Sequence, residues 1–212
     1  MRCFFALPLP AGARPALAGV QALLAEAARG CRWTPPGTLH LTLSFLGELC
    51  PEEVETARAI LLRLSPPARP PALAFDRLDW FPDRRRPRVL VALGALRPAA
   101  AGAVAGPDGL AELQLRLEAG LRAEGLISGQ SLPFRPHLSL ARLGGDSRRP
   151  AIPAALLSEA GALLAASGSW GFERLVLFES RLGRGGALHL PLAELGFGKS
   201  GLGPAGSASG AD

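Results

Sequence analysis

Residues 36–43 read PGTLHLTL, and residues 134–140 read FRPHLSL. Both stretches contain a histidine, a leucine, a hydroxyl residue and a leucine in that order, and the two histidines are 137 − 40 = 97 positions apart. Because strand side chains alternate between two faces, each stretch predicts a strand that presents an imidazole and a hydroxyl together. The repetition around two of the chain's three histidines indicates a paired functional site.

Each of the two predicted strands has a polar face. His40 and Thr42 share one face of the first strand, and His137 and Ser139 share one face of the second. The other face of the first strand is expected to point into the core, and it carries Leu39, Leu41, Leu43 and Phe45. Arg142 follows His137 by five residues, so strict alternation places it opposite the histidine. It can reach phosphate beside His137 only if the strand ends or bends before it.

The rest of the chain alternates between amphipathic and short apolar stretches. Helical spacing of apolar residues predicts helices over residues 14–28, 51–64, 110–123 and 154–165. Short apolar runs predict further strands at residues 3–7, 73–81, 88–93, 172–180 and 187–190. The order repeats approximately across two halves of the sequence, which indicates an α+β fold.

The composition is that of a compact protein. The chain has 212 residues, of which 48% are hydrophobic and 19% charged, enough for a single domain over residues 1–198. Residues 199–212 are rich in Gly, Ser and Ala and are predicted to be disordered. Apolar runs stay below the roughly 20 residues that span a bilayer, so we expect no membrane association. Residues 1–8, MRCFFALP, are interpreted as a buried strand rather than a signal peptide.

The cysteines and the charge limit the classes of protein to which the chain can belong. Three cysteines without CxxC spacing argue against a disulfide framework and a cysteine-rich zinc site, and we expect a cytoplasmic location. No cluster of His, Cys and carboxylate residues has metal-ligand spacing, so we expect no metal. The net charge of +5 comes almost wholly from arginine, since Lys199 is the only lysine. This bias has two interpretations: a GC-rich genome, or a surface suited to phosphate.

The residue types of the two motifs suit phosphodiester chemistry. Opening a cyclic phosphodiester requires one group that takes a proton from water and another that protonates the departing oxygen. Histidine can do both near neutral pH. Two imidazoles on opposite sides of one phosphorus would allow in-line displacement without a metal. Thr42 and Ser139 would donate hydrogen bonds to the non-bridging oxygens.

With these motifs the chain resembles the 2H phosphoesterase superfamily, specifically the bacterial and archaeal RNA 2′,3′-cyclic phosphodiesterases of the LigT/ThpR type. That family is defined by two His-x-[Thr/Ser]-x motifs, matched here at residues 40–43 and 137–140. The surroundings at residues 2–8, 45–48 and 134–137 are similar too. The resemblance covers about residues 1–195.

The resemblance implies a bilobed 2H phosphoesterase fold, with two pseudo-symmetric lobes of antiparallel sheets flanked by helices around a central cleft. It also implies metal-free, cofactor-free hydrolysis of RNA 2′,3′-cyclic phosphate ends to 2′-phosphate by His40 and His137, and in some members a reversible 2′–5′ RNA ligation. The family's arginine after the second motif corresponds to Arg142, which joins Thr42 and Ser139 as a phosphate ligand. We expect a monomer whose partners are RNA ends or nucleotides with a cyclic phosphate.

Several alternatives stay open. His40 is provisionally the acid and His137 the base, but pseudo-symmetry permits the reverse. His189 is interpreted as a structural or surface residue, with a third catalytic histidine or a metal ligand as alternatives. Four arginines within residues 83–88 fit RNA contacts or a solvated loop. The three tryptophans are expected in the core rather than stacked on bases. Rival functions are a 2H enzyme for another small cyclic phosphate, such as one of ADP-ribose, and a non-catalytic RNA- or nucleotide-binding module.

Overall fold

The computed structural model describes residues 1–67, 69–83, 87–95, 107–129, 133–144, 150–183 and 186–198. The predicted disordered tail and residues 84–86 of the arginine-rich loop lie outside these residues. Antiparallel pairings join the strands into one nine-stranded sheet. The strands are β1 (Arg2–Pro8), β2 (Cys31–Trp33), β3 (His40–Glu48), β4 (Ala72–Phe81), β5 (Val89–Ala95), β6 (His137–Leu143), β7 (Ser169–Gly171), β8 (Arg174–Gly183) and β9 (Gly186–Gly196).

Four α-helices and two short 3-10 helices accompany the sheet in the described part of the chain. The α-helices are α1 (Arg14–Leu24), α2 (Pro51–Arg63), α3 (Pro107–Ala123) and α4 (Ala154–Ala166), and the 3-10 helices are η1 (Ala11–Ala13) and η2 (Pro36–Thr38). All four predicted helices are therefore present, although α1 ends four residues earlier than the predicted limit at residue 28. The strands β2 and β7 were not predicted, because three residues are too few to establish a period of two.

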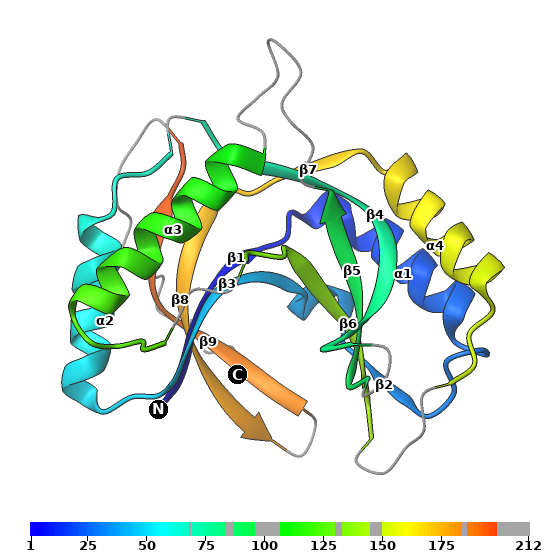
Figure 1. Ribbon diagram of the computed structural model, residues 1–212, viewed down its shortest axis with the longest axis horizontal. Helices are drawn as coiled ribbons and strands as arrows, with labels where there is room; N and C mark the ends of the chain where they lie inside the picture. The colour runs from blue at the N-terminus through cyan, green and yellow to red at the C-terminus, as the bar shows by residue number, and fades with distance from the viewer. Residues whose placement is uncertain are drawn as a thin grey trace, which may run out of the picture.

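The strand order is β7-β4-β5-β6-β3-β1-β8-β9, with β2 paired to β6. One lobe contains β3, β1, β8 and β9, and α2 packs there against β8, β9 and α3. The other lobe contains β6, β5, β4 and β7, with α4 packed on β4 and on α1. Figure 1 shows the two helix pairs at opposite ends of the molecule, with the strands between them. The predicted bilobed α+β fold is confirmed, with one continuous sheet in place of separate ones.

The lobes are not the two halves of the sequence. After β1 the chain crosses to the other lobe for α1, returns for β3 and α2, and crosses again for β4 and β5. It ends in the first lobe with β8 and β9. The pseudo-symmetry therefore relates strands by their place in the sheet, β3 to β6 and β1 to β5, rather than by a simple tandem repeat of the sequence.

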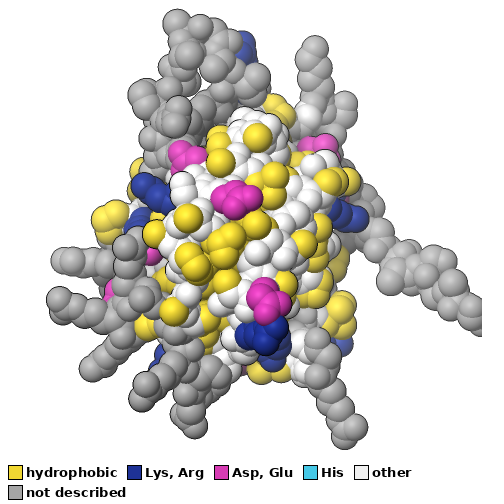
Figure 2. Space-filling view, turned by 90° about the vertical axis from the view of Figure 1, so that its right-hand side faces the viewer, with side chains coloured by type: hydrophobic (Ala, Val, Ile, Leu, Met, Phe, Trp, Pro, Cys, Tyr) yellow, Lys and Arg dark blue, Asp and Glu magenta, His cyan; other side chains and the backbone are white. Residues whose placement is uncertain are grey.

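Leucine supplies much of the core. The buried face of α3 consists of leucines at four-residue or three-residue spacing with no exposed surface: Leu110, Leu113, Leu117 and Leu121. Trp80 and Trp170 are buried, and Trp33 packs against the same core, as predicted. Figure 2 faces the side where α1 and α4 lie and shows apolar side chains spread over that surface among a few charged ones. Among the described helices, none is long and apolar enough to cross a membrane.

Candidate active site

The two motifs meet where the lobes join. β3 and β6 are antiparallel neighbours with Leu41 opposite Leu138, and both leucines are fully buried. Because the strands are antiparallel, the residue before Leu41 lies beside the residue after Leu138, so His40 is next to Ser139. The face of β3 and β6 that carries His40, Thr42, His137 and Ser139 is called the histidine face below. All four of these side chains are partly buried. The structure thus brings the four motif residues together about a local two-fold axis.

A β-bulge lies at the last residue of the first motif. Thr42 pairs with Ala6, but Ser44 pairs with Phe5, so Leu43 is an extra residue in β3. Leu43 and Ser44 are both buried although they are consecutive. A bulge of this kind reverses the alternation of the side chains that follow it, here as far as a second bulge at Leu46.

β6 has a bulge at the equivalent place. Ser139 pairs with Val91, whereas Ala141 pairs with Leu90, so Leu140 is the extra residue. Leu140 and Ala141 are both fully buried. Each bulge lies three residues after a motif histidine, so the two strands share backbone geometry as well as sequence.

The bulges bring Phe45 and Arg142 onto the histidine face, each five residues after its motif histidine. The expectation that Phe45 points into the core is wrong: its side chain is 63% exposed. The same reversal removes the geometric obstacle to Arg142, which is also exposed. Strict alternation could not reveal this, because a bulge depends on pairing with β1 or β5 rather than on the strand's own residues.

The two motif histidines are held in the same way. His40 Nδ1 lies 2.9 Å from the carbonyl oxygen of Thr38, and His137 Nδ1 lies 2.8 Å from that of Arg135. A carbonyl oxygen only accepts hydrogen bonds, so Nδ1 carries the proton in each neutral ring. Nε2 is then the unprotonated nitrogen of each ring, the one that can take up and release a proton.

Burial favours the neutral form of both imidazoles in the free protein. Burial lowers the pKa of His40 to about 4, although the hydrogen bond to Thr38 acts in the opposite direction. The charges of His189, Arg142 and His137 lower that pKa further. Burial is also the main cause that lowers the pKa of His137. A neutral Nε2 is a proton acceptor, and a bound phosphate would make protonation of either ring easier.

Positive charge gathers next to the histidines. Arg142 lies directly opposite Arg32 of β2. Partial burial of its guanidinium, and then the charges of Arg32 and Arg2, lower the pKa of Arg142. In the described ranges, neither Arg142 nor Arg32 forms an ion pair with a carboxylate. Like charges opposite each other repel, so an anion between them would be stabilising.

Aromatic rings that no sequence motif indicated surround the motif histidines. The Phe81 ring lies 4.6 Å from that of His137, between ring centroids, and the Arg135 guanidinium lies 4.7 Å from the Phe81 centroid. On the other side, the centroids of Phe4 and His189 lie 5.0 and 5.1 Å from that of His40. His189, interpreted from sequence as structural or surface, therefore contacts the site. Only the β8–β9 pairing puts it there, and no sequence pattern near residue 189 signals this.

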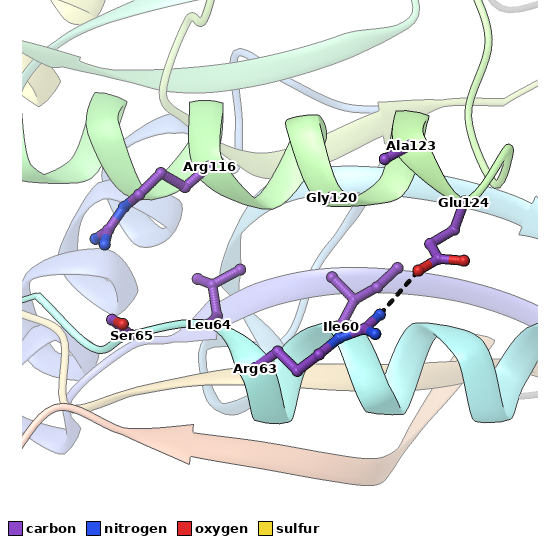
Figure 3. Close-up of a pocket in the computed structure, with 8 residues that line it drawn as sticks. All are labelled: Ile60, Arg63, Leu64, Ser65, Arg116, Gly120, Ala123 and Glu124. Atoms are coloured by element: carbon purple, nitrogen blue, oxygen red, sulfur yellow. Dashed lines mark hydrogen bonds and ion pairs between the residues drawn. The ribbon is translucent and has the colours of Figure 1, made fainter.

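Two cavities are lined by residues other than the four motif residues. One, of about 360 Å³, lies between α2 and α3 and contains the 3.0 Å ion pair between Arg63 and Glu124 (Figure 3). None of its lining residues belongs to β3 or β6. A second, of about 230 Å³, begins at the residues before His137 and is lined by Arg77, Leu93, Gly94, Phe134, Arg135 and Pro136. Within the described ranges, no group of three or more His, Cys, Asp and Glu residues is arranged to hold a metal ion.

The chain is similar to known phosphoesterases. The family model described as LigT like Phosphoesterase matches residues 7–91. A Thermus thermophilus protein named RNA 2′,3′-cyclic phosphodiesterase is 36% identical over 151 residues, which cover 67% of this chain and 68% of that protein. A Bacillus subtilis protein of the same name is 32% identical over 113 residues, 52% of this chain and 55% of that protein.

Solved structures of phosphoesterases are also similar to this chain. The crystal structure of the Thermus thermophilus protein TT0787 has 28% sequence identity and a TM-score of 0.71, covering 94% of this chain and 100% of that one. E. coli LigT complexed with 3′-AMP has 24% identity and a TM-score of 0.64, covering 92% and 97% of the two chains, and shows the same fold. With two matched histidine strands, this fold and these relatives, the chain belongs to the LigT-like phosphoesterase family.

Proposed function

We propose that the protein hydrolyses RNA ends that carry a 2′,3′-cyclic phosphate and leaves a 2′-phosphate, with His40 and His137 as the proton-transfer groups. One observation carries the proposal: two imidazoles related by a local two-fold axis, each with Nδ1 fixed by a carbonyl oxygen two residues earlier. A pair of proton-transfer groups held in this way suits a reaction that takes one proton and gives another. Relatives that carry the name of this activity support the substrate class.

The reaction follows from this arrangement. One Nε2 takes a proton from water as the water oxygen forms a bond to phosphorus. The bond from phosphorus to the ribose 3′ oxygen breaks, and the other imidazole, already protonated, gives its proton to that oxygen. Water is therefore divided between the 2′-phosphate and the new 3′ hydroxyl, and the two histidines exchange their protonation states. We assign His40 as the acid and His137 as the base.

The phosphate is held by groups beside the histidines. Thr42 and Ser139 lie on the histidine face and can donate hydrogen bonds to non-bridging oxygens, where negative charge increases in the transition state. Arg142, brought to that face by its bulge, would pair with the same oxygens through its guanidinium. Phe45 is exposed on that face in the other lobe, where a nucleobase could stack on its ring.

The test is hydrolysis of an RNA oligonucleotide ending in a 2′,3′-cyclic phosphate, in the presence of EDTA, with the phosphate isomer of the product identified. The proposal predicts multiple turnovers and a 2′-phosphate. Binding without turnover would instead indicate a non-catalytic RNA- or nucleotide-binding module. Turnover confined to small cyclic phosphates, such as one of ADP-ribose, would contradict the RNA part of the proposal.

A further inference from the structure

His189 reaches the site from the edge of the sheet. It belongs to β9 and lies opposite Ser180 of β8, while His40 belongs to β3, three positions away in the strand order. Three strand spacings in a flat sheet would separate them by about 14 Å. Their ring centroids are nevertheless 5.1 Å apart, with the rings perpendicular at 87°. The β8–β9 hairpin must therefore curl over the histidine face.

The backbone accounts for part of this curl. Leu177 of β8 pairs with Ala193, but Phe178 pairs with Pro191, so β9 has an extra residue between them. A bulge bends its strand and increases the local twist. The extra residue, Leu192, lies three residues beyond His189, between the hairpin end and the rest of β9. The position of His189 over the site is therefore a built feature of the hairpin rather than a chance contact of a mobile end.

The surroundings of the His189 ring make it a different kind of imidazole from the two motif histidines. Its Nδ1 is buried and has no hydrogen-bond partner in the described part of the chain, whereas Nδ1 of His40 and of His137 faces a carbonyl oxygen. Burial, and then the charge of Arg142, lower the pKa of His189, which favours the neutral ring. A proton on Nδ1 would be a buried donor without an acceptor, which is costly. The neutral ring therefore carries its proton on Nε2 and is a hydrogen-bond donor there.

The two aromatic side chains beside His189 offer no acceptor for that donor. Phe4 of β1 packs against the ring at 5.0 Å, and Phe178 of β8 lies at 6.3 Å, so these two neighbours offer no acceptor. Arg142 lies on the histidine face with His40 and His137, and its charge is among the causes that lower the pKa of all three histidines. An anion bound by Arg142 would lie among the three imidazoles.

We propose that His189 is a third imidazole of the phosphate site, whose Nε2–H donates a hydrogen bond to a phosphate oxygen held by Arg142. This inference rests on the proposed function. It gives His189 a binding role and not a proton transfer, since His40 and His137 already provide both proton transfers.

Two substitutions separate the donor from the ring. His189→Phe keeps an aromatic ring against Phe4 and His40 but lacks the donor, and His189→Gln keeps an N–H donor without the aromatic ring. With RNA 2′,3′-cyclic phosphate as substrate, His189→Phe is expected to lower kcat/KM on the order of ten- to a hundred-fold, as for loss of a hydrogen bond to a charged group. His189→Gln should recover most of it. The matched control is Leu188→Phe, a change at the exposed neighbouring residue, which should stay at the wild-type value.

Wild-type kcat/KM in His189→Phe would overturn the proposal, and so would equal losses in the Phe and Gln variants. Titration calorimetry with inorganic phosphate gives a readout that needs no turnover. The proposal predicts weaker phosphate binding by His189→Phe than by the wild-type protein and by His189→Gln. If the wild-type protein failed to hydrolyse RNA cyclic phosphate, the proposed function would fail, while the phosphate affinities would still decide the role of His189.

Discussion

The motif strands β3 and β6 have the same backbone geometry, but the side chains that follow the two motifs differ. Each presents a histidine and a hydroxyl, each has a bulge three residues after the histidine, and each turns the fifth residue back onto the histidine face. That fifth residue is Phe45 in one lobe and Arg142 in the other. The surroundings differ too: Phe4 and a second imidazole pack against His40, whereas Phe81, with the Arg135 guanidinium over its ring, packs against His137.

This comparison suggests how a symmetric scaffold serves an asymmetric substrate. A cyclic phosphate needs two similar proton-transfer groups, but the nucleotide that carries it has a base on one side only. The common backbone positions the matched histidines. The fifth residue after each histidine supplies an aromatic ring in one lobe and a cation in the other. Substitutions in the two strands test where the two lobes are equivalent and where they are not.

The lobes should be equivalent at the histidines. His40→Ala and His137→Ala each remove one of two proton transfers, so each should reduce kcat by about 10²- to 10⁴-fold, the usual contribution of such a group. Both variants should keep the wild-type circular dichroism spectrum. Steady-state kinetics on RNA 2′,3′-cyclic phosphate measure the effect, and wild-type turnover in either folded variant would refute the two-histidine mechanism.

Loss of either hydroxyl should lower kcat less than loss of either histidine. Thr42→Ala and Ser139→Ala each remove one donor to a non-bridging oxygen, and each should lower kcat about ten- to a thousand-fold, by analogy with loss of an oxyanion-hole donor. Thr42→Ser and Ser139→Thr keep the donor and are the matched controls. If the alanine variants matched their controls, the hydroxyls would not contact the phosphate.

At Arg142 the lobes should differ, because the equivalent residue of the other lobe is the uncharged Phe45, and the pH dependence of kcat/KM reports the effect of the Arg142 charge. Catalysis needs one protonated and one neutral imidazole, and burial lowers both pKa values below 6.5. The singly protonated pair is then most abundant below pH 6.5, so kcat/KM should peak there and fall toward neutral pH. Arg142→Gln removes a positive charge that lowers both pKa values, so the peak should move to higher pH.

The same variant should also bind phosphate less well and lose about ten- to a hundred-fold in kcat/KM at its optimum. A pH–rate profile of wild type and Arg142→Gln, with Arg32→Gln for comparison, measures both effects. A peak that stays in place, or moves to lower pH, would show that Arg142 does not act on the two histidines.

Phe45 should have the smallest effect. Phe45→Leu keeps an apolar residue but removes the ring face, so KM should rise by about three- to ten-fold with kcat unchanged. Leu182→Ala, at another exposed apolar residue, is a control. A fall in kcat without a change in KM would mean that the ring acts on the chemistry and not on substrate binding.

Much of this site could be predicted from the sequence because period-two alternation is a local property. The strands around His40 and His137, the hydroxyls beside them and the four helices all follow from such local patterns. The exposed side of Phe45 could not, since the bulge that turns it outward exists only when β3 pairs with β1. The contact of His189 with the site could not be predicted for a related reason. Its position depends on the register and curl of a hairpin, which its neighbours in sequence do not encode.

The most direct test of the central claim replaces the 3′ bridging oxygen of the cyclic phosphate with sulfur. A thiolate departs without help from an acid, so the acid's variant should recover activity on this substrate and the base's variant should not. The account predicts that His40→Ala regains most of the wild-type rate while His137→Ala stays inactive, and the opposite result would exchange the two roles. Recovery in both variants would contradict the division of labour between two matched histidines.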